Sequence, residues 1–176
     1  MMRFLPDPAV LIAYSIACFV LFVTPGSDMS LVEGRLRALG LSLPPAKAPV
    51  ANYIGTKQSG DLLFVSGRVS QLRGEVGSEI TAPDANVAAR DAMLDLLAIV
   101  KADIGNLDRI VSVEQVRGFV RSAPSFTGQP GVIDGASDLL IALFGENGRH
   151  ARTATGAAQL PFGAAVQLDM IVRISP

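Results

Sequence analysis

Four polar side chains in the C-terminal part of the chain could together bind a small acid and position a water molecule. Arg152 carries a planar, permanently charged guanidinium that can hold a carboxylate through two parallel hydrogen bonds, unless it forms a structural ion pair with an acidic residue. Gln167 and Asp169 are two residues apart, so a strand would place both on one face. The glutamine can donate and accept hydrogen bonds, but only the carboxylate can take a proton. His150 would share the side of Arg152, although a lone histidine beside an arginine is more typical of a solvated loop.

The composition excludes several other kinds of site. The chain has 176 residues, with 15 lysines and arginines against 16 aspartates and glutamates, so its formal charge is −1. It lacks the diffuse positive field on which non-specific nucleic-acid binding depends. Cys18 is the only cysteine and His150 the only histidine, which excludes an internal disulfide, a cysteine-based zinc site, a histidine-rich metal site and a two-histidine ribonuclease pair. With 49% apolar residues, the chain can bury a core.

Helical and strand-like patterns alternate in the first half of the chain. They predict a helix at 29–40, an extended proline-rich connector at 43–49, a buried strand at 62–66 and a long helix at 84–104. The first helix would bury Leu31, Leu36 and Leu39 and end at Gly40. Asp84 would cap the long helix.

The second half predicts one more helix and three strands. The strands are at 110–120, with a bulge near Glu114, at 153–160 and at 166–174, and the helix runs from Asp134 or Ser137 to Phe144. A loop at 122–131 precedes this helix, and the glycines from Gly128 to Gly135 are interpreted as loop residues. Residues 161–163 would form a hairpin turn between the last two strands. The alternation of these strands and helices predicts an α+β fold, a single mixed sheet with two helices on one face.

An apolar leader precedes this body. Residues 9–23 contain one polar side chain, Ser15, and are somewhat short for a bilayer span. Residues 5–29 resemble the first transmembrane helix of lysine-exporter-type amino-acid transporters. Three interpretations of this leader, residues 1–28, are open: a membrane anchor, the product of a translation start placed upstream of the true start at Met29, or a recombined fragment. Residues 29–176 are expected to form the folded domain.

Four short strings occur in order along the body. They are Asn52-Tyr53-Ile54, Leu63-Phe64-Val65-Ser66-Gly67, Gly105-Asn106-Leu107-Asp108-Arg109-Ile110-Val111, and His150-Ala151-Arg152-Thr153 followed by Leu160-Pro161. Their order and spacing resemble the Rid (reactive intermediate deaminase) superfamily, also labelled YjgF-like or L-PSP endoribonuclease, over residues from about 36 to 176.

The resemblance implies a chorismate-mutase-like fold, assembled as a homotrimer with ligand sites in the clefts between subunits. It also implies hydrolysis of small 2-imino or enamino acids to 2-keto acids and ammonia, without a metal or other cofactor. The expected ligand is a small carboxylate metabolite. The expected location is the cytoplasm, with a membrane contact only if residues 9–23 are an anchor.

The same resemblance assigns roles to individual residues. Arg152 matches the arginine that holds the substrate carboxylate, and Tyr53 matches the tyrosine that closes over the ligand. Ser66 and Gly67 match the strand end that lines the cleft.

Three departures from the family pattern concern the chemistry. Gln167 stands where a carboxylate able to activate water is often found, and Asp169, on the same face, could take its place. Ala154 stands where a cysteine is often found, and the asparagine-bearing loop is altered, with Asp134 in its region.

Several functions remain open on the sequence alone. The first is imine deamination by Arg152, Gln167 and Asp169, since an iminium carbon is electrophilic enough to need only a positioned, polarised water molecule. The second is a non-catalytic protein that binds a small carboxylate and has a regulatory role, which the neutral Gln167 favours. Single-strand ribonuclease activity is disfavoured by the neutral charge, the few aromatic residues and the single histidine.

Overall fold

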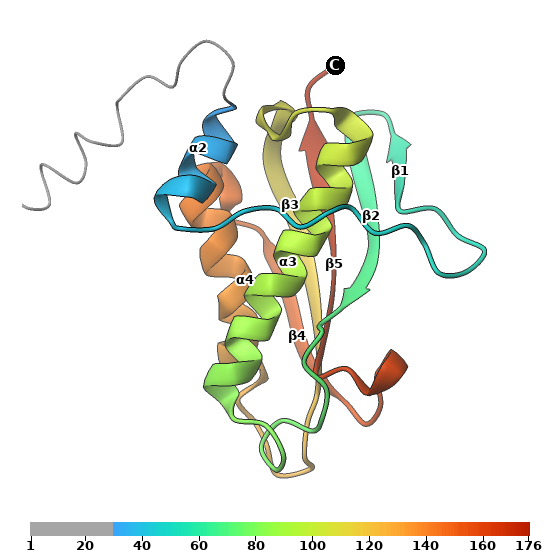
Figure 1. The fold of residues 1–176 in the computed structure, drawn as a ribbon, viewed down its shortest axis with the longest axis vertical. Helices are drawn as coiled ribbons and strands as arrows, with labels where there is room; N and C mark the ends of the chain where they lie inside the picture. The colour runs from blue at the N-terminus through green and yellow to red at the C-terminus, as the bar shows by residue number, and fades with distance from the viewer. Residues whose placement is uncertain (1–29) are drawn as a thin grey trace, which may run out of the picture.

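The computed structural model describes residues 30–176, which form a five-stranded mixed sheet and three α-helices (Figure 1). The interpretations of residues 1–28 fall outside the described residues. Within residues 30–176, no helix has the length and apolar character needed to cross a membrane. In chain order the elements are α2 (Leu31–Ala38), β1 (Thr56–Ser59), β2 (Leu62–Val69), α3 (Ala82–Ile104), β3 (Ile110–Arg121), α4 (Gln129–Phe144), β4 (Ala151–Ala157) and β5 (Val166–Ile174).

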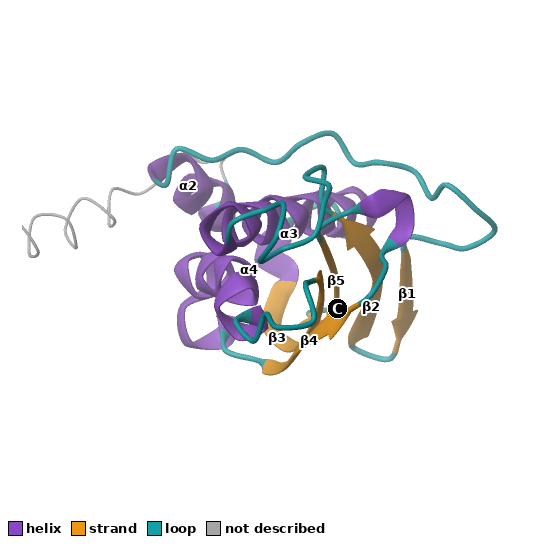
Figure 2. Cartoon of the chain, turned by 90° about the horizontal axis from the view of Figure 1, so that it is seen from below, coloured by secondary structure: helices purple, strands orange, loops and turns teal. Residues whose placement is uncertain are grey.

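The molecule has two layers, as the predicted α+β fold requires. The strands lie in the order β1-β2-β5-β3-β4, and α3 and α4 lie side by side on one face of the sheet (Figure 2). In the described part of the chain, the other face of the sheet carries no helix. The prediction of a single mixed sheet with two helices on one face is confirmed, and α2 is added beside α4.

Strand β5 shows how the sequence pattern determines the two faces. Its burial alternates without exception along nine residues. The side chains beneath the helices are Val166, Leu168, Met170, Val172 and Ile174, and those on the helix-free face are Gln167, Asp169, Ile171 and Arg173. A strand with this period has one face for the core and one for other contacts.

The predicted hairpin between the last two strands is wrong. Strand β4 pairs in parallel with β3 at the edge of the sheet, and β5 lies between β2 and β3. The physical reason is burial: the five apolar side chains of β5 need the central position beneath both helices, whereas the small residues of β4 tolerate an edge. A short 3₁₀ turn at Pro161–Gly163 lies between β4 and β5 in the chain.

Three other expectations are corrected. Strand β2 is longer than predicted and half-buried, because Phe64 faces away from the helices while Leu63 and Val65 are buried. Helix α3 is capped by the Thr81 hydroxyl, which accepts a hydrogen bond from the Asp84 N–H, so Asp84 lies inside the helix. Helix α4 begins at Gln129 rather than at Asp134 or Ser137.

The early start of α4 follows from Pro130. Proline is tolerated in the first turn of a helix because the N–H it lacks would have no partner there. As a result, Asp134 and Ser137 are helical residues, and so are Gly131 and Gly135, which the sequence suggested were loop glycines.

Helix α2 is attached to the domain through its buried face and its first turn. It buries Val32 and Leu36, four residues apart, whereas the predicted Leu31 and Leu39 are exposed. The Asp108 carboxylate accepts hydrogen bonds from the N–H groups of Leu31 and Val32, at 2.8 and 2.9 Å. Asp108 thus caps, from another part of the chain, a helix whose own N-terminal residue makes no side-chain cap.

The stability conferred by this cap should depend on pH. Burial alone raises the pKa of Asp108, but hydrogen bonds from Val32, Ser30 and Leu31 and the charge of Arg35 outweigh it and lower the pKa below its ordinary 3.8. The stabilisation is therefore present above pH 3.8 and lost as the pH falls through the lower folded value. In urea unfolding at pH 7, the Asp108→Asn substitution should lower the free energy of unfolding by about 1 kcal/mol, because solvent screens this largely exposed carboxylate.

The control for this prediction is Asp138→Asn, which removes the same charge from an exposed site on α4. It should leave the unfolding midpoint unchanged. The difference between wild type and Asp108→Asn should shrink below pH 3.8, and an equal difference at pH 3 and pH 7 would contradict the assignment.

Candidate functional site

A hollow of about 260 Å³ opens on the helix-free face of the sheet, where β2 and β5 are neighbours. Four of the predicted site residues line it: Ser66, Gly67, Gln167 and Asp169. The register between β2 and β5 shifts after Val65, which brings Gly67 against Gln167. A Cβ added at Gly67 would lie 3.3 Å from Nε2 of Gln167, so glycine allows this close approach of the backbone to the amide.

Two of these side chains already have partners. Asp169 Oδ1 accepts a hydrogen bond from Arg117 Nε at 2.7 Å, in an ion pair across β5 and β3. The Ser66 hydroxyl donates to the carbonyl of Ile54 at 2.6 Å, which ties the segment just before β1 to β2. Tyr53 adjoins Ile54 in this segment and is 40% exposed, but it does not line the hollow.

Arg152 lies on the opposite side of the sheet, on the edge strand β4. Its register partner on β3, Val116, is fully buried beneath the helices. Arg152 Nη1 donates to Asp134 Oδ1 at 2.6 Å and to the Ser137 hydroxyl at 3.0 Å, and both of these residues lie on α4. Within residues 30–176, Nε and Nη2 of Arg152 make no hydrogen bond, so one edge of the guanidinium remains available.

His150 belongs to the same cluster, which corrects its interpretation as a solvated loop residue. Its Nδ1 donates to the carbonyl of Gly148 at 2.7 Å, so Nε2 is the acceptor for the Ser137 hydroxyl at 3.1 Å. Burial lowers the pKa of His150, and together with the charge of Arg152 it outweighs the hydrogen bond to the Gly148 carbonyl, which acts to raise that pKa. The hydrogen of the Ser137 hydroxyl therefore points at His150, and its oxygen is free to accept from Arg152.

The predicted site residues thus form two groups within one chain. Ser66, Gly67, Gln167 and Asp169 meet on the helix-free face, whereas Arg152 joins the helix side of the sheet. The sequence interpretation missed Arg117 as the partner of Asp169. It also gave Asp134 and Ser137 no contact with Arg152, although their spacing of three residues would have placed them on one face of a helix.

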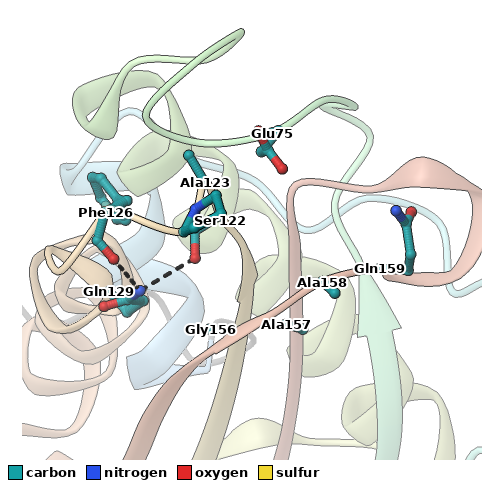
Figure 3. Close-up of a pocket in the computed structure, with 10 residues that line it drawn as sticks. Glu75, Ser122, Ala123, Phe126, Gln129, Gly156, Ala157, Ala158 and Gln159 are labelled. Carbon is teal, nitrogen blue, oxygen red and sulfur yellow. Dashed lines mark hydrogen bonds between the residues drawn. The ribbon is translucent and has the colours of Figure 1, made fainter.

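A second hollow, of about 480 Å³, lies at the C-terminal ends of β3 and β4 (Figure 3). Its polar centre is the Gln129 amide, whose Nε2 donates to the carbonyl of Phe126 at 2.7 Å and to the Ser122 hydroxyl at 3.2 Å. These bonds hold the first turn of α4 against the end of β3. Across residues 30–176, no cluster of three histidine, cysteine, aspartate or glutamate side chains is placed to hold a metal ion.

Comparison with known proteins shows the family to which the chain belongs. The family model described as "YjgF/chorismate mutase-like, putative endoribonuclease" matches residues 33–172. The crystal structure of Atu1372 from Agrobacterium tumefaciens, a protein of unknown function, is 44% identical, with a TM-score of 0.77 over 82% of this chain and 92% of that one.

Two curated proteins are also similar to the chain. Protein TCP17 of Trypanosoma cruzi is 43% identical over 82% of this chain and 94% of its own length. A 2-iminobutanoate/2-iminopropanoate deaminase of Dermatophagoides farinae is 26% identical over 76% of this chain and 94% of its own length. The match to the family model and the shared fold lead to one conclusion: the chain belongs to the YjgF/chorismate-mutase-like family.

Proposed function

We propose that the chain hydrolyses small 2-imino acids to 2-keto acids and ammonia, in clefts formed between copies of itself. The observation that carries this proposal is the geometry of Arg152. Asp134 and Ser137 both bind to Nη1 and hold the guanidinium in place, which leaves the Nε–Nη2 edge for a ligand. That edge matches a carboxylate in spacing and charge.

The two groups of site residues call for more than one copy of the chain. Arg152 and the Gln167 hollow lie on opposite faces of one sheet, so a single subunit does not bring them together. The helix-free face exposes Phe64 beside the hollow, and the outer edge of β4 has no strand partner within residues 30–176. We propose that neighbouring copies, in the homotrimer that the family resemblance implies, cover this face and complete the site.

The proposed reaction needs little from the protein beyond positioning. A water oxygen bonds to the electrophilic iminium carbon while the π electron pair of the C=N bond moves to the nitrogen, and one proton then passes from that oxygen to the nitrogen. The C–N bond breaks with its electron pair leaving on ammonia, and the carbonyl forms as the remaining hydroxyl proton passes to the leaving ammonia, which departs as ammonium. Gln167 can orient the water through its amide, although it cannot take the proton. The relative named as a 2-iminobutanoate/2-iminopropanoate deaminase supports this class of substrate.

A second candidate is a protein that binds a small carboxylate without turning it over. Two observations favour it: Gln167 is neutral, and Asp169 is already paired with Arg117. The hollow then offers hydrogen bonds but no free carboxylate base. Under this alternative the Arg152 edge would still bind the ligand.

An imine-trapping assay separates the two candidates. An amino-acid oxidase generates the imino acid, semicarbazide traps it, and the purified full chain is added or omitted. Hydrolysis predicts less trapped product with the chain present, in proportion to its concentration. Unchanged trapping across several amino acids would reject the deaminase and leave the binding protein.

A further inference from the structure

We infer that His150 is a proton-dependent second cation of the Arg152 site, so that the site binds small carboxylates more tightly when the imidazole is protonated. His150 acts through Ser137 and Arg152 and does not touch the ligand. This inference rests on the proposed function, because it takes Arg152 as the group that binds the carboxylate. The same linkage would hold if the ligand were bound without turnover.

The first support is an unbroken chain of hydrogen bonds from the imidazole to the guanidinium. Nδ1 of His150 donates to the Gly148 carbonyl at 2.7 Å. Nε2 of His150 lies 3.1 Å from the Ser137 hydroxyl oxygen, which lies 3.0 Å from Nη1 of Arg152. A single oxygen atom thus connects the two nitrogens, so the charge of either group acts on the other.

The second support is that the connection is buried and fixed. Ser137 is 7% exposed, so water screens the interaction between the two groups only weakly. The acceptor for Nδ1, Gly148, is packed against α4: a Cβ there would lie 2.2 Å from the carbonyl oxygen of Leu140. The imidazole is therefore held with Nε2 towards Ser137.

Protonation adds a charge to this cluster without breaking the connection. In the neutral form the Ser137 hydroxyl donates to Nε2 of His150 and accepts from Arg152. When a proton binds to Nε2, the hydroxyl oxygen can accept from both residues, because it has two lone pairs. Its own hydrogen can then turn to the helix carbonyl four residues earlier, as serines inside helices do. The Nε–Nη2 edge of Arg152 stays available in both forms.

The third support is that the charges around His150 leave the new charge uncompensated. On α4, on the turn before β4, on β4 itself and on the adjoining end of β3, the charged side chains are paired or exposed. They are Arg152 with Asp134, Arg149 with Glu146, Glu114 with Arg173, and the exposed Asp138. A carboxylate on Arg152 therefore meets one more positive charge when His150 is protonated.

The direction of the linkage follows from the pKa of His150. Burial lowers this pKa below its ordinary 6.5, the hydrogen bond to Gly148 acts to raise it, and the charge of Arg152 lowers it. A carboxylate that offsets the charge of Arg152 should therefore raise the pKa of His150. By reciprocity, protonation of His150 strengthens carboxylate binding by the same factor. The effect is present below the pKa of His150 and is lost as the pH rises through it.

The test uses pyruvate as the carboxylate probe and the full chain without a histidine tag. His150 is the only histidine of the chain, so its imidazole C2 proton gives one NMR signal, whose titration midpoint is the pKa. Saturating pyruvate should move this midpoint to higher pH. In calorimetry, pyruvate should bind about threefold more tightly at pH 5 than at pH 8, and the two effects should agree.

Three variants separate this linkage from a structural role of His150. His150→Gln keeps an amide oxygen that can accept from Ser137 but does not titrate, so its affinity for pyruvate should be that of wild type at pH 8 and nearly the same at pH 5. Arg152→Ala should raise the NMR midpoint of the free chain and abolish the response to pyruvate. The matched control is Arg149→Ala, which removes the same charge from an exposed neighbour and should leave the midpoint nearly unchanged.

The outcomes distinguish failure of the linkage from failure of the proposed function. The linkage is overturned if pyruvate binds through Arg152 while the midpoint of His150 stays where it is, a result that needs no variant of His150. It is also overturned if Arg149→Ala and Arg152→Ala shift the midpoint equally, because net charge alone would then be the cause. If pyruvate does not bind, or binds to Arg152→Ala as to wild type, the proposed function fails and the linkage fails with it.

Discussion

A single methyl group added at Gly135 should lower the free energy of unfolding by about 3 kcal/mol or more. Gly135 lies inside α4 where that helix contacts α3. A Cβ there would stand 2.1 Å from the carbonyl oxygen of Asn86 and 2.9 Å from its carbonyl carbon. Because both atoms are backbone atoms of α3, the clash can be relieved only by moving one helix away from the other.

The measurement is thermal and urea unfolding of Gly135→Ala. For a domain of this size the expected loss corresponds to a fall of about 10 °C in Tm. Gly131→Ala is the matched control, because Gly131 lies on the same helix and its Cβ would meet nothing within 4 Å.

Helix propensity alone makes both substitutions favourable, by up to about 1 kcal/mol. Gly131→Ala should therefore be neutral or stabilising, and it keeps the carbonyl that accepts a hydrogen bond from Asn86 Nδ2 at 2.8 Å. Similar stability of the two variants would show that α3 and α4 separate at little cost.

Features encoded by nearby residues could be predicted from the sequence. The alternation along β5 predicted which side chains enter the core, and the spacing of apolar residues predicted α3. The bulge predicted near Glu114 is confirmed, because the register between β3 and β5 shifts after Val113. In each case the signal lies in residues that follow one another in the chain.

Features that depend on distant residues could not be predicted in this way. The sequence predicts a loop at Gly135, because the reason for a glycine there is the backbone of Asn86, which lies on another helix. The short turn at 161–163 suggested a hairpin because nothing in β4 indicates a parallel partner on β3. In both cases, contacts between residues far apart in the sequence determine the structure: the packing of α4 against α3 for Gly135, and the burial of β5 in the centre of the sheet for the turn.

The candidate site shows the same limit. The chemistry of Arg152 follows from its residue type, but its ion pair with Asp134 depends on a helix that begins earlier than its cap-like residues suggested. The sequence left both an ion pair and a carboxylate clamp open for Arg152. The structure shows the ion pair, and the position of that pair leaves the other edge available.

Removing the guanidinium of Arg152 should therefore cost activity rather than stability. Two charge-assisted hydrogen bonds to a carboxylate predict a fall in kcat/KM of about 100-fold or more for Arg152→Ala in the imine-trapping assay. Arg152→Lys keeps the charge but lacks the planar fork, so we expect a fall of about tenfold or more. The free energy of unfolding should change by no more than about 1 kcal/mol in either variant, because Asp134 is about half exposed.

Arg149→Ala tests whether any loss is specific to Arg152. Arg149 lies on the same segment, is exposed, and pairs only with Glu146 among residues 30–176. Its removal should leave kcat/KM unchanged. If Arg152→Ala keeps wild-type kcat/KM while its fold is intact, the ligand carboxylate is held elsewhere, and the ion pair with Asp134 is then the whole role of Arg152. If Arg152→Lys equals wild type, a point charge suffices and the bidentate contact is not needed.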